Sequence, residues 1–189
     1  INFSDLLPAT LSLAGNGIPH HVQGIPFMGH QVDEPRKYMA GARSRADNMY
    51  EVSRSIRDDR FFYVRHYMPH MPYIQPGYIF SDKKLSFKYL RAMHEDGKLP
   101  PESEEMWHPK PVEELYDLQN DPFELNNLMD NPKYLEKMEE LKNAMHQWVA
   151  DTRDAGFLFE PEMMIRGTSS TVYEMAQDTT QYDLEAIHS

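Results

Sequence analysis

The fold is decided by residues 112–128, which read VEELYDLQNDPFELNNL. Residues 114–118 read as a short strand. Asn120-Asp121-Pro122 predicts a turn, because Asn and Asp bond to their own backbone and Pro fixes φ. The Glu-Leu-Asn-Asn-Leu run that follows leads toward a helix. The segment therefore predicts a strand, a turn and a helix in succession.

The helix that follows is the clearest one in the chain. Asn131-Pro132 is a strong start signal, since Asn caps a helix and Pro suits its first position. We expect the helix to run to about Ala155 and to end at Gly156. Its apolar residues recur at helical spacing and predict a buried stripe, made of Leu135, Met138, Leu141, Met145, Trp148, Val149 and Thr152.

Upstream, residues 50–57 and 60–67 read as two strands of a hairpin that turns at Asp58-Asp59. Both faces of the second strand carry large residues, which indicates a central strand. A shorter strand is expected at residues 38–42. The predicted fold class is therefore α+β: an antiparallel sheet of about four strands, with the long helix packed on one face.

The remaining segments are read from capping and turn residues. A first helix is expected to begin at Ser4 or Asp5 and to end at Gly15, followed by a Gly- and Pro-rich loop over residues 15–36. Ser81 or Asp82 can cap a further helix that runs to about residue 96. Shorter helices are expected after Pro100-Pro101, near residues 171–176 and from Tyr182 onward.

Composition excludes some classes of function. The chain has 189 residues, 30 of them acidic and 19 basic, for a formal net charge of -11. This balance argues against a nucleic acid partner, which needs a basic surface. The chain has no cysteine, so disulfide and thiolate chemistry are absent from this stretch. No apolar run approaches the roughly 20 residues of a membrane span.

Four segments in this order resemble one family. Residues 2–15 (NFSDLLPATLSLAG), 21–27 (HVQGIPF) and 54–65 (RSIRDDRFFYVR) precede the opening motif at 112–128. Together they resemble the C-terminal portion of the sulfatases, members of the alkaline-phosphatase-like superfamily. The similarity covers roughly residues 1–156. Within the family the chain is most similar to bacterial N-sulfoglucosamine sulfohydrolase-like enzymes and arylsulfatases.

The resemblance implies a domain organisation. Residues 1–48 are expected to form the end of a large α/β sulfatase domain, residues 49–156 the C-terminal subdomain and residues 157–189 a tail. We also expect the chain to be a fragment, whose first helix exposes its apolar face when the larger domain is absent.

The resemblance also implies a reaction, the hydrolysis of sulfate esters or sulfamates in a sulfated carbohydrate or aryl sulfate. In the family the nucleophile is a formylglycine made from Cys or Ser, and a divalent cation, usually calcium, polarises the sulfate. Those residues lie upstream of this chain, so no catalytic or metal-binding residue is assigned here. The remaining N-terminal sulfatase domain is the expected partner, and a periplasmic or secreted bacterial location is expected from the family.

The best candidates for substrate binding lie in the segment that contains Arg43, Arg45 and Asp47. Guanidinium groups recognise sulfate and carboxylate oxygens bidentately, and Asp can accept from sugar hydroxyls. The alternative is a structural salt-bridge loop. Asp47-Asn48 also resembles the family's late metal-ligand pair, but it comes after the first helix rather than before it, so a turn or cap is the better interpretation.

Two histidines complete the candidate substrate residues. His20 lies in the Gly- and Pro-rich loop, and His70 lies in a Pro-rich segment with Tyr67 and Tyr73. Both loops could line a sugar cleft, with surface or packing roles as the alternatives. His66 and His70 are four apart, but Pro69 lies between them and a metal site is not expected.

Two other functions stay open. The chain could be a sulfatase-like module without catalysis, used for binding or packing. It could also belong to a phosphonate or phosphodiester hydrolase of the same superfamily, because fold alone does not separate these activities.

Overall fold

The computed structural model describes residues 1–46, 48–75, 77, 83–184 and 186. The chain forms two compact units, Ile1–Met39 and Ala40–Ser189. The predicted organisation of the chain into three segments, with residues 1–48 belonging to a larger domain, stays a prediction.

The first unit is a helix held against a loop. A 3-10 turn, Phe3–Asp5, leads into α1, Leu6–Leu13. Buried Asp5 accepts hydrogen bonds from the backbone N–H groups of Asn2 and Ile25, at 2.8 and 3.0 Å, and forms an ion pair with Arg36 at 2.6 Å. The helix therefore begins near the predicted position. The unit leaves several large apolar residues exposed, namely Ile1, Phe3, Leu6, Leu7 and Leu13.

The second unit contains the predicted antiparallel sheet. Its strands are β1 (Met39–Ala46), β2 (Met49–Arg57), β3 (Phe61–His66) and β4 (Glu113–Asp117), in the order β1-β2-β3-β4. The turn between β2 and β3 is set by Asp58, whose carboxylate accepts from the backbone N–H of Arg60 and Phe61. β3 pairs with both neighbours, so the prediction of a central strand is confirmed.

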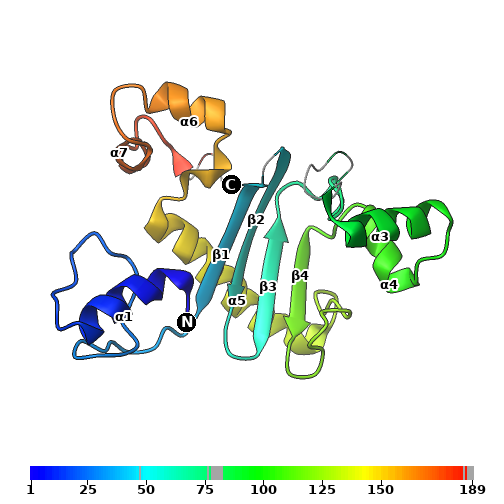
Figure 1. Cartoon of the computed structure of the whole chain (residues 1–189), viewed down its shortest axis with the longest axis horizontal. Helices are drawn as coiled ribbons and strands as arrows, with labels where there is room; N and C mark the ends of the chain where they lie inside the picture. Colours follow the sequence, from blue (N-terminus) through cyan, green and yellow to red (C-terminus); the bar gives the residue numbers. More distant parts are fainter. Residues whose placement is uncertain (47, 76, 78–82, 185, 187–189) are drawn as a thin grey trace. The chain divides into compact units, whose positions relative to one another are not determined.

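The long helix α5, Leu135–Thr152, follows a 3-10 turn at Pro132–Tyr134 and covers one face of the sheet (Figure 1). Leu141, Met145 and Val149 form its buried stripe, as predicted. Leu135 and Thr152 were expected in that stripe but are exposed, because they occupy the first and last helical positions, beyond the buried part of the stripe.

The end of α5 differs from the prediction. The helix ends at Thr152, and Arg153 adopts the left-handed conformation with φ 50°. Such a φ is unfavourable for a residue with a side chain, but here the Arg153 guanidinium donates to the carbonyls of Ala176 and Tyr182, both at 2.8 Å. Contacts with the residues that follow thus end the helix three residues before the predicted position.

Residues 155–184 pack against the end of α5. They form a 3-10 turn, Ala155–Phe157, and the helices α6, Glu160–Arg166, and α7, Val172–Gln177. The helix predicted near residues 171–176 is α7, whereas α6 was not predicted. An apolar cluster joins the segment to α5, made of Val149, Leu158, Met175, Ala176, Tyr182 and Leu184. The helix expected from Tyr182 falls largely on residues outside the described ones.

A buried arginine fastens this segment to the sheet. Arg54 of β2 has a fully buried side chain and forms a two-point ion pair with Asp154. Its remaining N–H groups donate to the carbonyls of Ser53 and Arg43 and to the Ser44 hydroxyl. The guanidinium also lies 4.6 Å from the centre of the Phe157 ring.

Between β3 and β4 the chain makes a long excursion, residues 67–112, drawn beside the sheet near the start of β4 (Figure 1). It contains α3, Leu85–Glu95, α4, Pro101–Glu104, and a 3-10 turn, Glu105–Trp107. The predicted cap at Ser81 or Asp82 lies outside the described residues. The two ends of the excursion pair with each other, through Lys110 N–H to the Pro69 carbonyl at 2.8 Å and a bridge between Pro72 and Pro109.

Candidate functional site

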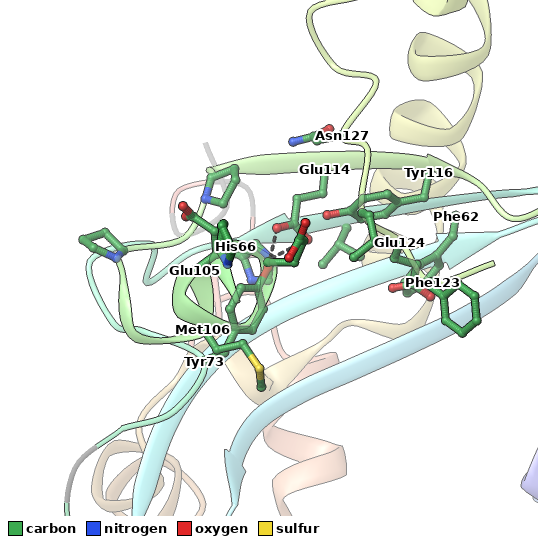
Figure 2. Close-up of a pocket in the computed structure, with 16 residues that line it drawn as sticks. Phe62, His66, Tyr73, Glu105, Met106, Glu114, Tyr116, Phe123, Glu124 and Asn127 are labelled. Atoms are coloured by element: carbon green, nitrogen blue, oxygen red, sulfur yellow. Dashed lines mark hydrogen bonds and ion pairs between the residues drawn. The ribbon is translucent and has the colours of Figure 1, made fainter. Parts of the chain in front are cut away.

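An open cavity of about 790 Å³ lies on the face of the sheet that α5 does not cover (Figure 2). Strand alternation builds its floor, because every second residue of β3 and β4 points to the same face. Val64 lies directly opposite Glu114, and Phe62 lies opposite Tyr116. The walls come from the excursion and from the loop after β4.

Glu114 is the centre of the hydrogen bonds in the cavity. One carboxylate oxygen lies 3.1 Å from Nε2 of His66, and the other accepts from the Tyr73 hydroxyl (Figure 2). Burial and the hydrogen bond to Glu114 raise the pKa of Tyr73 well above its ordinary value. Burial and the nearby Glu114 charge also raise the pKa of Tyr116. Both phenols therefore stay protonated and can act as donors at neutral pH.

A buried ion-pair network lies beside His66. Nζ of Lys110, whose side chain is fully buried, is 2.6 Å from Oε1 of Glu51, and the Arg43 guanidinium is 3.0 Å from Oε2. Nδ1 of His66 lies 3.9 Å from Glu51. Because buried charges are costly unless they are paired, this network fixes the start of β4 and the end of the excursion against β2.

The loop after β4 supplies the outer wall of the cavity. Asn127 holds the loop to β4, since its Oδ1 accepts from Leu115 N–H at 3.0 Å and its Nδ2 donates to the Glu113 carbonyl at 3.1 Å. Glu124 has a positive φ of 57°, which is unfavourable for a residue with a Cβ. Burial, and next the charges of Glu114 and Asp121, raise the pKa of Glu124. The loop thus presents a carboxylate at the cavity from a residue with an unfavourable backbone conformation.

The composition of the lining defines what the cavity can bind. It combines aromatic and apolar side chains with four carboxylates: Glu102, Glu105, Glu114 and Glu124. Cavities of this size accommodate small ligands. The carboxylates disfavour a sulfate group, because like charges repel. They suit a hydrogen-bond donor or a cation instead.

The sequence-predicted arginines lie on β1, outside this cavity. Arg43 pairs with Glu51, and Nε of Arg45 lies 2.8 Å from Oε1 of Glu160 in α6. Both arginine side chains are about two-fifths exposed, at 42% and 41%. Arg45 also borders a smaller cavity of about 230 Å³ between β1, β2 and residues 156–163. The ion pairs agree with the salt-bridge alternative, while the exposed fraction leaves room for a ligand.

The other predicted site residues lie in different parts of the chain. His20 is exposed in the first unit, its ring edge-on to that of His21 at 5.6 Å. His70 is exposed in the second unit, at the start of the excursion. Asp47 lies outside the described residues. The described part of the second unit brings Arg43 and Arg45 onto one strand, and the role of all five residues in substrate binding stays a prediction.

Sequence reasoning did not single out the buried network. Glu51 and Lys110 are 59 residues apart, and nothing local marks either as one half of an ion pair. His66 lies on the same strand face as Phe62 and Val64, but its partner Glu114 comes from the next strand. Only the antiparallel register, which places the start of β4 beside the end of β3, could have suggested this pair.

In the described residues, no three His, Cys, Asp or Glu side chains gather in a way that could hold a metal ion. Among the same residues, no helix is both long and apolar enough to span a bilayer.

The fold defines a structural class, an α+β subdomain in which a long helix covers a four-stranded antiparallel sheet. Comparison with known proteins makes the assignment more specific. The chain is 34% identical over 165 residues to an ulvan-active sulfatase of Formosa agariphila, a match that covers 87% of the chain and 28% of the relative. A second ulvan-active sulfatase of that organism is 29% identical over 155 residues, covering 79% of the chain and 28% of the relative. No protein-family model matches.

A solved structure of a 2-O GAG sulfatase shares the fold, with a TM-score of 0.51 and 21% identity, over 79% of this chain and 25% of that one. The chain belongs to the sulfatase family and corresponds to its C-terminal portion. It spans less than a third of the length of the curated relatives that it matches.

Proposed function

We propose that this chain is the C-terminal part of a sulfatase that hydrolyses sulfate esters or sulfamates of a sulfated glycan. The observation that carries the proposal is the 34% identity to an ulvan-active sulfatase over 87% of the chain. The formylglycine nucleophile and the calcium ligands belong to the remainder of the protein. The chain supplies structure and part of the substrate cleft, and it is inactive by itself.

Within this proposal Arg43 and Arg45 bind anionic groups of the substrate. The two arginines lie two residues apart on β1. The guanidinium of Arg43 pairs with the carboxylate of Glu51, and that of Arg45 pairs with the carboxylate of Glu160. A guanidinium has five N–H donors in a planar fork, so one carboxylate does not use all of them. Asp47, His20 and His70 are the further candidates for contacts with sugar hydroxyls.

The test is sulfate release by the full-length protein that contains this chain, secreted or periplasmic as expected for the family. Ulvan, a sulfated glycosaminoglycan and an aryl sulfate serve as probes, with a phosphodiester and a phosphonate as the alternative substrates. Release of inorganic sulfate, lost on chelation of calcium and on replacement of the formylglycine precursor, supports the proposal. Hydrolysis of the phosphorus substrates alone favours the other superfamily activity, and turnover of none favours a non-catalytic module.

The arginine assignment has its own matched variants. Arg45→Lys keeps the charge but loses the planar fork, and we expect KM to rise about tenfold with little change in kcat. Arg166→Lys is the control, because Arg166 is also a partly exposed arginine paired with a glutamate, Glu162 at 2.7 Å. Equal kinetics for the two variants would contradict a substrate contact at Arg45.

A further inference from the structure

The cavity over β3 and β4 combines an apolar wall with charges of a single sign. Among its lining residues are Glu102, Glu105 and Glu124 around the opening, and none of the lining residues is a lysine or an arginine. Glu114, the fourth carboxylate, is already engaged by His66 and Tyr73. The three outer carboxylates are exposed, so they remain available to a ligand.

The carboxylates of the cavity also act on one another. The pKa of Glu124 is raised by burial and then by the charges of Glu114 and Asp121, with Arg57 opposing them from β2. A bound cation reduces this repulsion. Cations also bind favourably to aromatic faces. The lining offers Phe62, Tyr116 and Phe123, whereas the ring of Tyr73 already lies 5.0 Å from Nζ of Lys110.

The rim of the cavity has the character of an interface. Phe123 is 81% exposed and Leu125 is 60% exposed, on either side of Glu124. Large apolar side chains that stay this exposed at a concave site mark a contact surface. Arginine with its long apolar stem is enriched at the centre of such interfaces, where it packs against aromatic residues.

We propose that this cavity docks an arginine or lysine side chain, flanked by apolar residues, from a segment of the same protein outside these 189 residues. The proposal rests on the proposed function in one respect, namely that the chain is part of a longer polypeptide. Charge complementarity selects a basic segment, and the chain spans only 28% of the length of the relatives that it matches.

The test compares the accessibility of carboxylates in the full-length protein and in the 189-residue chain. Both are labelled with carbodiimide and glycine ethyl ester, and each site is quantified by mass spectrometry. We expect Glu102, Glu105 and Glu124 to react about tenfold more slowly in the full-length protein, because an interface core excludes water. Glu136 and Glu139, exposed on α5, serve as controls with little change. Equal protection of all five glutamates overturns the proposal, as does protection of none.

Charge reversal gives an independent measurement. In the full-length protein, Glu105→Lys places a lysine against the docked cation, so we expect a clearly larger fall in Tm than for Glu136→Lys. In the isolated chain, Glu105→Lys relieves repulsion among carboxylates, so its Tm is expected to stay level or rise. If the isolated chain does not fold, the comparison of Glu105→Lys with Glu136→Lys in the full-length protein is sufficient. An equal fall in Tm for these two variants overturns the proposed docking.

These readouts need no catalytic turnover. A protein that protects the cavity but releases no sulfate overturns the proposed function and leaves this inference standing. A protein that releases sulfate, but whose cavity carboxylates are labelled freely, supports the proposed function and overturns this inference.

Discussion

Removal of the Asp154 carboxylate leaves a charged arginine buried without its partner. The Arg54 side chain is 0% exposed and that of Asp154 is 12% exposed, so water cannot replace the lost ion pair at low cost. Breaking a buried pair in this way costs about 3–5 kcal/mol. We therefore expect Asp154→Ala to lower the free energy of unfolding by that amount, a large share of the stability of an ordinary domain.

The measurement is urea and thermal unfolding of the chain followed by circular dichroism. For a domain of this size, about 2–4 °C of Tm accompanies each kcal/mol, so the expected fall in Tm is roughly 6–20 °C. Asp151→Ala is the control, because Asp151 is exposed near the end of α5 and accepts a hydrogen bond from the neighbouring Gln147 of the same helix. Its effect should stay within about 0.5 kcal/mol.

A double variant tests the reasoning itself. Arg54→Met combined with Asp154→Ala removes the stranded charge, so the double variant should be more stable than Asp154→Ala alone. Recovery stays incomplete, because the carbonyls of Ser53 and Arg43 lose the donor that Arg54 gave them. If Asp154→Ala behaves like Asp151→Ala, the ion pair does not hold residues 155–184 to the sheet and the argument is refuted.

Three further predictions concern single residues. The hydrogen bonds and charge of Arg60 hold the pKa of Asp117 well below its ordinary 3.8, so the stability that it contributes is present above about pH 4 and lost as pH falls through the lowered pKa. Asp117→Asn should therefore lower the urea midpoint at pH 7 and make the midpoint decline less steeply below pH 4. If the midpoints of the two proteins change with pH in parallel, the ionised Asp117 does not contribute this stability. Glu124→Gly should stabilise the chain by about 0.5–1 kcal/mol in urea unfolding, because glycine tolerates a positive φ and the substitution removes a crowded carboxylate; a loss of stability contradicts this. Gly156→Ala should cost about 1–3 kcal/mol, since a Cβ there would lie within 3 Å of three side-chain atoms, whereas Gly17→Ala meets nothing within 4 Å and measures the background.

The sheet and the long helix were predictable because their signals are local. Residues 50–67 show strand alternation around an Asp-Asp turn, and Asn131-Pro132 marks a helix start by capping chemistry alone. The end of α5 was not predictable, since it depends on carbonyls more than 20 residues away that accept from Arg153. The helix α6 was missed because it is short, and its Met164 and Ile165 remain exposed, so it has no clear buried stripe.

For the candidate site, the sequence indicated candidate residues by their type but did not indicate which residues they pair with. Arg43 and Arg45 stand out in sequence as two guanidinium groups in one segment, but their carboxylate partners come from β2 and α6. The cavity depends on which residues of β3 and β4 share a face and on where the excursion returns. Those facts follow from register and long-range pairing, which a single sequence does not encode locally.

The excursion between β3 and β4 has a consequence for how this architecture can diversify. Its two ends are joined by the hydrogen bond from Lys110 N–H to the Pro69 carbonyl and by the β-bridge between Pro72 and Pro109. Changing the length of the segment between these paired ends adds little closure entropy, about 0.6 kcal/mol for each doubling. Residues 75–105 can therefore be exchanged for a shorter or longer insert while β3 and β4 keep their register. The wall of the cavity can thus be replaced without rebuilding its floor.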